Sequence, residues 1–239
     1  MTQPILHSSN RMLASLPAAD LDSLLPQLRP VDFPLGKVLF AAGDTISSVY
    51  FPHAGVISLV VELATGEMIE AAMIGREGLV GGMSALDNKI STTRAIVQVA
   101  GSGSVIDAEP LRKLAIGSAG FRATLIKHEQ VLLAQAQQSA ACNATHLIEA
   151  RLSRWLLRCR DLVGSDDFQL TQEFLGQMMG VRRTSVSIVA NTLQQAGLIK
   201  YKRGNIRVTN LEGLRDAACE CYATVKSISD RLIGAGPSP

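Results

Sequence analysis

The sequence lacks the features of a membrane or secreted protein. None of its apolar runs reaches the roughly 18 residues that a membrane-spanning helix needs, so no such helix is expected. Residues 1–10 contain no basic stretch followed by an apolar core, which argues against a secretory signal. The four cysteines, the first of which is Cys142, are late and unevenly spaced, as expected of reduced thiols rather than of a disulfide framework. We therefore expect a cytoplasmic protein with no membrane partner.

Charge and catalytic motifs are also scarce. Only 18% of the 239 residues are charged and 47% are hydrophobic, so the chain can pack a sizeable core and extended disorder is expected only at its ends. Nucleophile motifs, phosphate-binding loops and dinucleotide fingerprints are absent, so no catalytic residue is assigned and no enzyme is expected. The histidines are scattered, at His7, His53, His128 and His146.

Cys219 and Cys221 form a C-x-C pair near the end of the chain. A metal or redox role for this pair is open, but two thiols with no nearby histidine make an incomplete metal site. Ordinary half-buried cysteines are the favoured interpretation, and no metal site is expected.

The chain divides into three regions with different residue patterns. Residues 11–28 place leucines at helical spacing, and residues 31–106 contain short β-prone runs at 37–40, 48–51, 56–61 and 94–99. Glycines separate these runs, which is typical of a sandwich, roll or barrel.

A helical pattern returns from 109 to 163 and includes a long helix from about Phe121 to Cys142. Leu125, Leu132 and their neighbours predict that this helix packs on a second copy, because a monomer would expose a large apolar patch. The alternative is a helix that packs only on its own domain.

The segment 170–199 carries the strongest functional signal. It predicts two short helices joined by a tight turn at Gly180, each with an apolar stripe. The second helix opens on Arg182 and Arg183 and bears small polar groups on its outward side, which suits the major groove of DNA. Residues 200–208 then predict a basic hairpin with its turn at Gly204–Asn205, which completes a winged helix.

The basic residues are concentrated in the same segment. Residues 151–210 carry 10 basic and 4 acidic side chains, whereas the regions before and after them are slightly acidic. This asymmetry is typical of a face that binds phosphates. Alternatives are an RNA- or protein-binding adaptor, and a β-roll enzyme with an accessory DNA-binding domain. The residues expected to contact double-stranded DNA are Thr171, Gln172, Arg182, Arg183, Thr184, Ser185, Ser187, Ile188, Lys202 and Arg203.

A β-roll, a long helix and a winged helix in this order resemble the Crp/Fnr family of bacterial transcription regulators over nearly the whole length. The residues that carry the resemblance are 43–44, 49–51, Gly55, 151–156, 170–173, Gly180 and 198–199. It implies an α+β fold with a β-roll (double-stranded jelly roll) effector domain at 1–118, a dimerisation helix at 119–143 and a winged helix-turn-helix with a short tail at 144–239. It further implies a homodimer on a two-fold symmetric operator, allosteric control through the roll, and RNA polymerase as a partner.

The chain departs from the cyclic-nucleotide members of this family. They carry Gly-Glu-(Leu/Ile)-(Ala/Gly) and later Arg-(Ser/Thr)-Ala, where this chain has GREG at 75–78 and TTRA at 92–95. An effector pocket is expected around Gly75, Arg76, Glu77 and Arg94. Arg94 lies one position from the family's arginine and so on the wrong strand face, which makes cyclic AMP doubtful. The alternative is a cyclic-nucleotide-responsive regulator that uses Arg94. No iron–sulfur cluster is expected without an amino-terminal cysteine cluster, and the effector remains unknown.

The reading helix departs as well. Many members place Arg, Glu and a second Arg on the groove face, and these positions hold Arg183, Thr184 and Ile188 here. The operator is therefore expected to differ from the family's TGTGA-like half-site. Ile188 either touches a thymine methyl group or covers the seam between the two helices.

Overall fold

The computed structural model describes residues 9–87 and 89–234, and the structural statements below concern these ranges. His7 and nearly all of the predicted tail at 234–239 lie outside them, as does most of the amino-terminal segment judged to lack a signal. Within the described ranges, no helix combines the length and apolar character that crossing a membrane would require.

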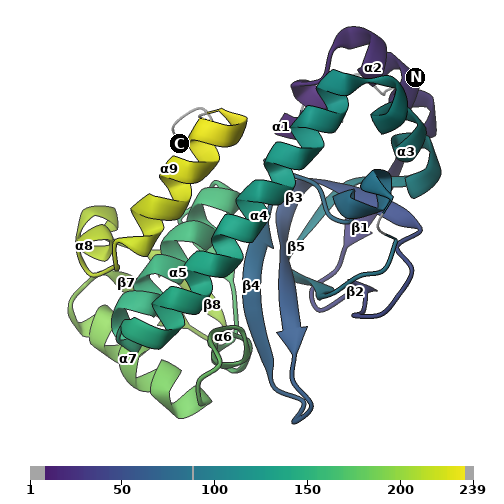
Figure 1. Cartoon of the computed structure of the whole chain (residues 1–239). Coiled ribbons are helices and arrows are strands. Elements are labelled where there is room, and N and C mark those ends of the chain that lie inside the picture. The colour runs from purple at the N-terminus through teal and green to yellow at the C-terminus, as the bar shows by residue number, and fades with distance from the viewer. Residues whose placement is uncertain (1–8, 88, 235–239) are drawn as a thin grey trace.

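Residues 29–107 build an antiparallel sheet that curls into the predicted roll (Figure 1). Its strand order is β1-β5-β3-β4, and β2 also pairs with β5. The two longest strands bend where glycine is required: Gly55 has φ +88°, and a Cβ on Gly101 would lie 2.0 Å from the Ala54 carbonyl oxygen. The strands are β1 (Arg29–Phe33), β2 (Val38–Phe40), β3 (Ser48–Glu62), β4 (Met68–Ile74) and β5 (Arg94–Asp107).

Helices cover one end of the roll and lead away from it. The predicted helical stretch at 11–28 is broken into α1 and α2, followed by a 3-10 turn, and Asn10 caps α1 by accepting from the Leu13 amide. A second 3-10 turn precedes β5. These elements are α1 (Arg11–Ala14), α2 (Ala18–Leu24), η2 (Leu25–Gln27), η3 (Gly82–Leu86), α3 (Ala108–Gly117) and α4 (Ala119–Thr145).

The long helix α4 runs from the roll to the carboxy-terminal domain (Figure 1). The expectation that Leu125 faces a second copy is wrong, because this side chain is fully buried among Phe121, Leu79 and other residues of its own domain. Leu132 is half-buried against the interior of the roll. Packing within the chain therefore accounts for both leucines, and an interface with a partner has to use other positions.

The carboxy-terminal domain is the predicted winged helix-turn-helix. The hairpin turn lies one residue earlier than predicted, because Arg203 (φ +51°) and Gly204 (φ +80°) take its two central positions while Asn205 begins β8. Positive φ at both positions is what a two-residue type I′ hairpin demands. The elements are α5 (Ile148–Val163), β6 (Asp167–Gln169), α6 (Gln172–Met179), α7 (Arg183–Gln195), β7 (Ile199–Lys202), β8 (Asn205–Val208), α8 (Leu211–Asp216) and α9 (Cys221–Ile233).

The two domains share one hydrophobic core. Trp155 of α5 is buried in the same cluster as Val60 and Met73 of the roll. Its indole Nε1 donates a hydrogen bond to Glu70 Oε1 of β4 at 3.0 Å. Truncating a buried aromatic side chain of this size costs about 3–5 kcal/mol, so the roll and the carboxy-terminal domain stabilise each other substantially.

Candidate nucleic-acid interface

The first helix of the motif, α6, has well-defined ends. Thr171 caps it, with its hydroxyl accepting from the Phe174 amide at 3.2 Å. Gly180 ends it in the left-handed conformation, with φ +62°. This glycine also lies against Ile69 of β4, so the turn of the motif touches the roll.

The second helix, α7, separates a buried stripe from an exposed face. Val186, Ala190 and Leu193 are buried against α5 and α6 at helical spacing. The first turn carries no side-chain cap, so the positive end of the helix dipole is open to anions. The exposed residues on the outer face are Arg182, Arg183, Thr184, Ile188 and Asn191.

Ser187 and Gln172, two of the expected contact residues, hold the motif together. Ser187 donates its hydroxyl proton to Gln172 Oε1 at 2.6 Å, which joins α7 to the start of α6.

Ile188 is 68% exposed and so does not cover the seam between the helices. Of the two roles considered for Ile188, only contact with an external apolar group fits this exposure. Ser185, also on α7, is half-buried.

The wing extends the same surface. Lys202 and Arg203 are exposed, and Tyr201 anchors the hairpin by donating from its hydroxyl to the Leu170 carbonyl oxygen at 3.1 Å. Thr171 and Arg203 line a common hollow, which places the start of α6 beside the wing tip. The cations are little compensated: Arg183 lies 4.0 Å from Glu173, and both side chains are well exposed. The expected DNA contacts therefore lie on three adjoining elements.

The residues expected to form an effector pocket fall in two places, with Arg94 apart from Gly75, Arg76 and Glu77. Arg94 pairs with Glu62 at 2.7 Å and its Nη1 lies 3.6 Å from the Met68 sulfur. Glu77 instead accepts from Arg158 of α5 at 3.0 Å. Met68 and residue 75 are at opposite ends of β4, roughly 20 Å apart at the usual rise of a strand. Glu77 thus joins the two domains, and Gly75 also packs on α5, against Leu162.

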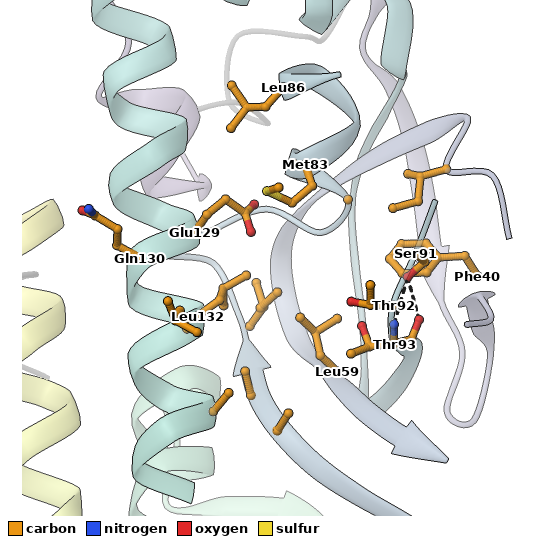
Figure 2. A pocket seen from close by; sticks show the side chains of 18 of the residues that line it. Phe40, Leu59, Met83, Leu86, Ser91, Thr92, Thr93, Glu129, Gln130 and Leu132 are labelled. Atoms are coloured by element: carbon orange, nitrogen blue, oxygen red, sulfur yellow. Dashed lines mark hydrogen bonds between the residues drawn. The ribbon is translucent and has the colours of Figure 1, made fainter. Parts of the chain in front are cut away.

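A cavity of about 550 Å³ lies between the roll and α4 (Figure 2). Its wall is mostly apolar, with Phe40 and Leu59 from the roll and Leu132 from α4. The polar side chains include Thr92 and Thr93 on the roll and Glu129, which points from α4 toward Met83. No lysine or arginine of the described chain lines it, and sequence reasoning missed it because its walls come from distant segments.

Comparison with known proteins covers both domains. A family model described as "Cyclic nucleotide-binding domain" matches residues 30–116, and one described as "Crp-like helix-turn-helix domain" matches residues 150–217. A relative from Mycobacterium tuberculosis, described as a CRP-like cAMP-activated global transcriptional regulator, is 23% identical over 203 residues. That match covers 80% of this chain and 89% of the relative.

Solved structures share the whole architecture. FixK2 from Bradyrhizobium japonicum superposes with a TM-score of 0.70 at 15% identity, covering 80% of this chain and 98% of that one. The c-di-GMP responsive global regulator CLP of Xanthomonas campestris gives 0.65 at 17% identity, with 80% and 99% coverage. These similarities establish the fold, with its amino-terminal β-roll and carboxy-terminal helix-turn-helix.

Proposed function

This chain belongs to the Crp/Fnr family of transcription regulators and is a DNA-binding regulator, and we propose that it reads a two-fold symmetric operator as a homodimer through α7 and the wing. The observation that carries the proposal is the exposed face of α7, which presents Arg183, Thr184 and Ile188 beside the basic wing tip. A protruding helix with this face fits the major groove.

The contacts divide into two kinds. Arg183 and Thr184 stand at the start of α7, where a recognition helix reaches base edges, and arginine there pairs bidentately with guanine. Ile188, one turn further on, is suited to the methyl group of thymine. Thr171, Gln172, Lys202 and Arg203 flank the helix and suit the phosphates on either side. The first set would select sequence and the second would supply affinity.

A stripe along α4 supports the homodimer. Exposed positions recur at alternating steps of three and four residues, which is the spacing of a two-helix seam. Its largest apolar members, Ile126 and Leu133, are 45% and 59% exposed. Parallel packing of two such stripes would pair the two copies of α7. The stripe consists of Ala123, Ile126, Gln130, Leu133, Gln137, Ala140 and Ala144.

The cavity beside α4 is the proposed effector site in place of the residues first expected. Its volume suits a small molecule. The Glu129 carboxylate and the lack of a lining cation in the described residues disfavour a cyclic phosphate. We propose a largely apolar effector with a cationic or hydrogen-bond-donating group for Glu129. Because the cavity lies between the roll and α4, occupancy could bias the spacing of the two recognition helices.

Equilibrium binding to duplex DNA and to RNA of the same sequence tests the proposed function. Genomic fragments upstream of the protein's own gene serve as the first duplex probes. Specific retention on DNA, with affinity falling steeply as salt rises, is expected because several phosphates are neutralised at once. Equal or tighter binding to RNA would favour the alternative of a winged helix with a non-DNA partner. We also propose a contact with RNA polymerase, as the family resemblance implies, and this contact needs an experiment of its own.

A further inference from the structure

Three cysteines and one histidine meet where α4 ends and α9 begins. Cys142 and His146 lie at the end of α4, whereas Cys219 and Cys221 lie at the start of α9. One ligand atom from each, three Sγ and one ring nitrogen, all lie within 4.8 Å of one another. The three cysteines are buried. The sequence-based view that the C-x-C pair has no nearby histidine is therefore wrong, because the fold supplies His146.

The spacing of these atoms matches a tetrahedral ion. Zinc bonds of about 2.3 Å to sulfur and about 2.0 Å to nitrogen place two sulfurs about 3.8 Å apart, and sulfur and nitrogen about 3.5 Å apart. The Sγ atoms of Cys142 and Cys219 are 3.5 Å apart, and Cys221 Sγ lies 3.6 Å from His146 Nδ1. A disulfide would need about 2.05 Å between the sulfurs, so these two thiols are not bonded to each other.

The surroundings are also those of a metal site. While His146 Nδ1 faces the sulfurs, its Nε2 lies 3.3 Å from the Glu220 carboxylate, the partner that commonly orients a metal-bound histidine. Gln138 Nε2 donates to Cys221 Sγ at 3.0 Å. Arg154 and Cys221 line the same small hollow, so a positive charge lies beside the sulfurs. A site of three thiolates, one neutral histidine and Zn²⁺ is net negative, so this charge is complementary.

We propose that Cys142, His146, Cys219 and Cys221 form a Zn²⁺ site that fastens α9 to the end of α4. Four protein ligands leave no open position, which is the property of a structural rather than a catalytic zinc. The site lies where α4, the helix that carries the exposed stripe, meets the DNA-binding domain, beside the connection from α4 to α5 (Figure 1).

The zinc site also reaches the helix-turn-helix through one residue. Arg151, which is buried and close to Cys142 and Cys219, donates from Nη2 to the Met179 carbonyl oxygen at 2.5 Å. Met179 is the last residue of α6. The zinc–thiolate group would therefore steady Arg151 and, through it, the end of α6. This inference does not depend on the proposed DNA contacts, since metal content is measured on the free protein.

Metal analysis of the whole protein, purified under reducing conditions, tests the site. We expect about one zinc per chain, lost in Cys219→Ala and His146→Ala. Cys159→Ala is the matched control, because Cys159 is equally buried but lies in the core of α5, and it should retain the zinc. Co²⁺ added to chelator-treated protein should give the visible absorption of a tetrahedral thiolate complex.

A further variant separates ligation from folding. Glu220 is well exposed, so Glu220→Gln should leave the fold intact while weakening zinc affinity by about 10–100-fold in a competition titration with a chromophoric chelator. Three results would overturn the proposal: parent protein without zinc that gives no Co²⁺ spectrum, a Cys142–Cys219 disulfide in reduced zinc-free preparations, or stoichiometric iron or copper instead. Unchanged zinc affinity in Glu220→Gln would contradict the assigned role of that carboxylate.

Discussion

At the scale of single residues, we expect sequence selection to depend most on the side chain of Arg183. Arg183→Ala should weaken binding to the specific operator by about 10–100-fold, corresponding to the 1–3 kcal/mol of a bidentate base contact. Thermal stability should be unchanged, because this side chain is exposed. Its ion pair with Glu173, at 4.0 Å, is weak since both side chains are in solvent. Fluorescence anisotropy on operator and scrambled duplexes measures the binding effect, and a thermal melt measures stability.

Two controls make the Arg183 result specific. Arg29→Ala removes a comparably exposed cation of β1 that pairs with Asp107, and it should leave DNA binding alone. Lys202→Ala in the wing should weaken operator and scrambled duplex alike and lower the salt dependence by about one ion. Operator affinity in Arg183→Ala equal to that of the parent would show that α7 does not read the bases.

Local chemistry explains why the helix-turn-helix was predictable. A capping Thr171, a left-handed Gly180 and an apolar stripe are all encoded within a few residues of the helices they define. Glu70 and Trp155 are 85 positions apart, and Cys142 and Cys219 are 77 apart. Such pairs follow from tertiary packing, which periodicity does not report, so the domain contact and the zinc ligands escaped prediction.

At the scale of elements, strand β4 was missed for a related reason. A strand with one face in solvent alternates apolar and polar residues, but β4 packs on α6 and α4 as well as on β3, and it contacts α5 through Glu70. Its partly buried first half, which includes Glu70, therefore shows no clean alternation. The β-prone runs and glycines predicted a sandwich, roll or barrel, and the resemblance to a known family selected the roll among these.

Glu70 of β4 makes the contact between domains sensitive to pH. Burial raises the pKa of its carboxyl group to about 7, opposed mainly by its hydrogen bond from Ser58. Between the ordinary pKa of about 4.5 and pH 7, the folded protein thus retains a proton that the unfolded chain has lost. The resulting stabilisation is complete below that window and is lost as pH rises through it.

Glu70→Gln should flatten this dependence, because an amide can still accept from Trp155 but does not titrate. The melting temperature of the parent relative to the variant should fall between about pH 4.5 and pH 7.5. Glu67→Gln, on the exposed turn of the same hairpin, should follow the parent. Parallel melting curves for parent and Glu70→Gln across this range would refute the assignment.

The stripe on α4 gives a prediction about assembly. Leu133→Glu should shift the protein from dimer to monomer and reduce operator binding, because it places charge in the apolar part of the seam. Ile116→Glu is the matched control, since Ile116 is comparably exposed but lies on α3 away from the stripe. Sedimentation equilibrium at micromolar concentration measures the change. A parent protein that sediments as a monomer would remove the basis for the stripe's role.

The cavity of the roll predicts insensitivity to cyclic AMP. Arg94 is held by Glu62, and the cavity offers the Glu129 carboxylate where a cyclic phosphate would require a cation. Isothermal titration should therefore detect no micromolar binding, and cyclic AMP should leave DNA affinity unchanged. Saturable binding that Arg94→Ala abolishes would instead identify Arg94 as the phosphate ligand.

At the scale of the whole molecule, the cavity, β4 and the reading helices form one continuous structure. Ala72 and Ile74 of β4 line the cavity, while Glu70 and Ile69 of the same strand contact α5 and the turn of the helix-turn-helix. The Glu77–Arg158 ion pair adds a further link at the end of β4. We propose that an effector that shifts β4 acts on α5 and on the Gly180 turn, which precedes α7.

Selection of random duplex DNA by the purified protein, followed by sequencing, tests the central claim most directly. The account predicts an enriched inverted repeat whose half-sites are centred about 10 base pairs, or one helical turn, apart, because two copies of α7 enter successive major grooves. The half-site should contain a guanine lost from the motif selected by Arg183→Ala. Enrichment of no motif, or of a lone half-site, would contradict a symmetric dimer that reads DNA through α7.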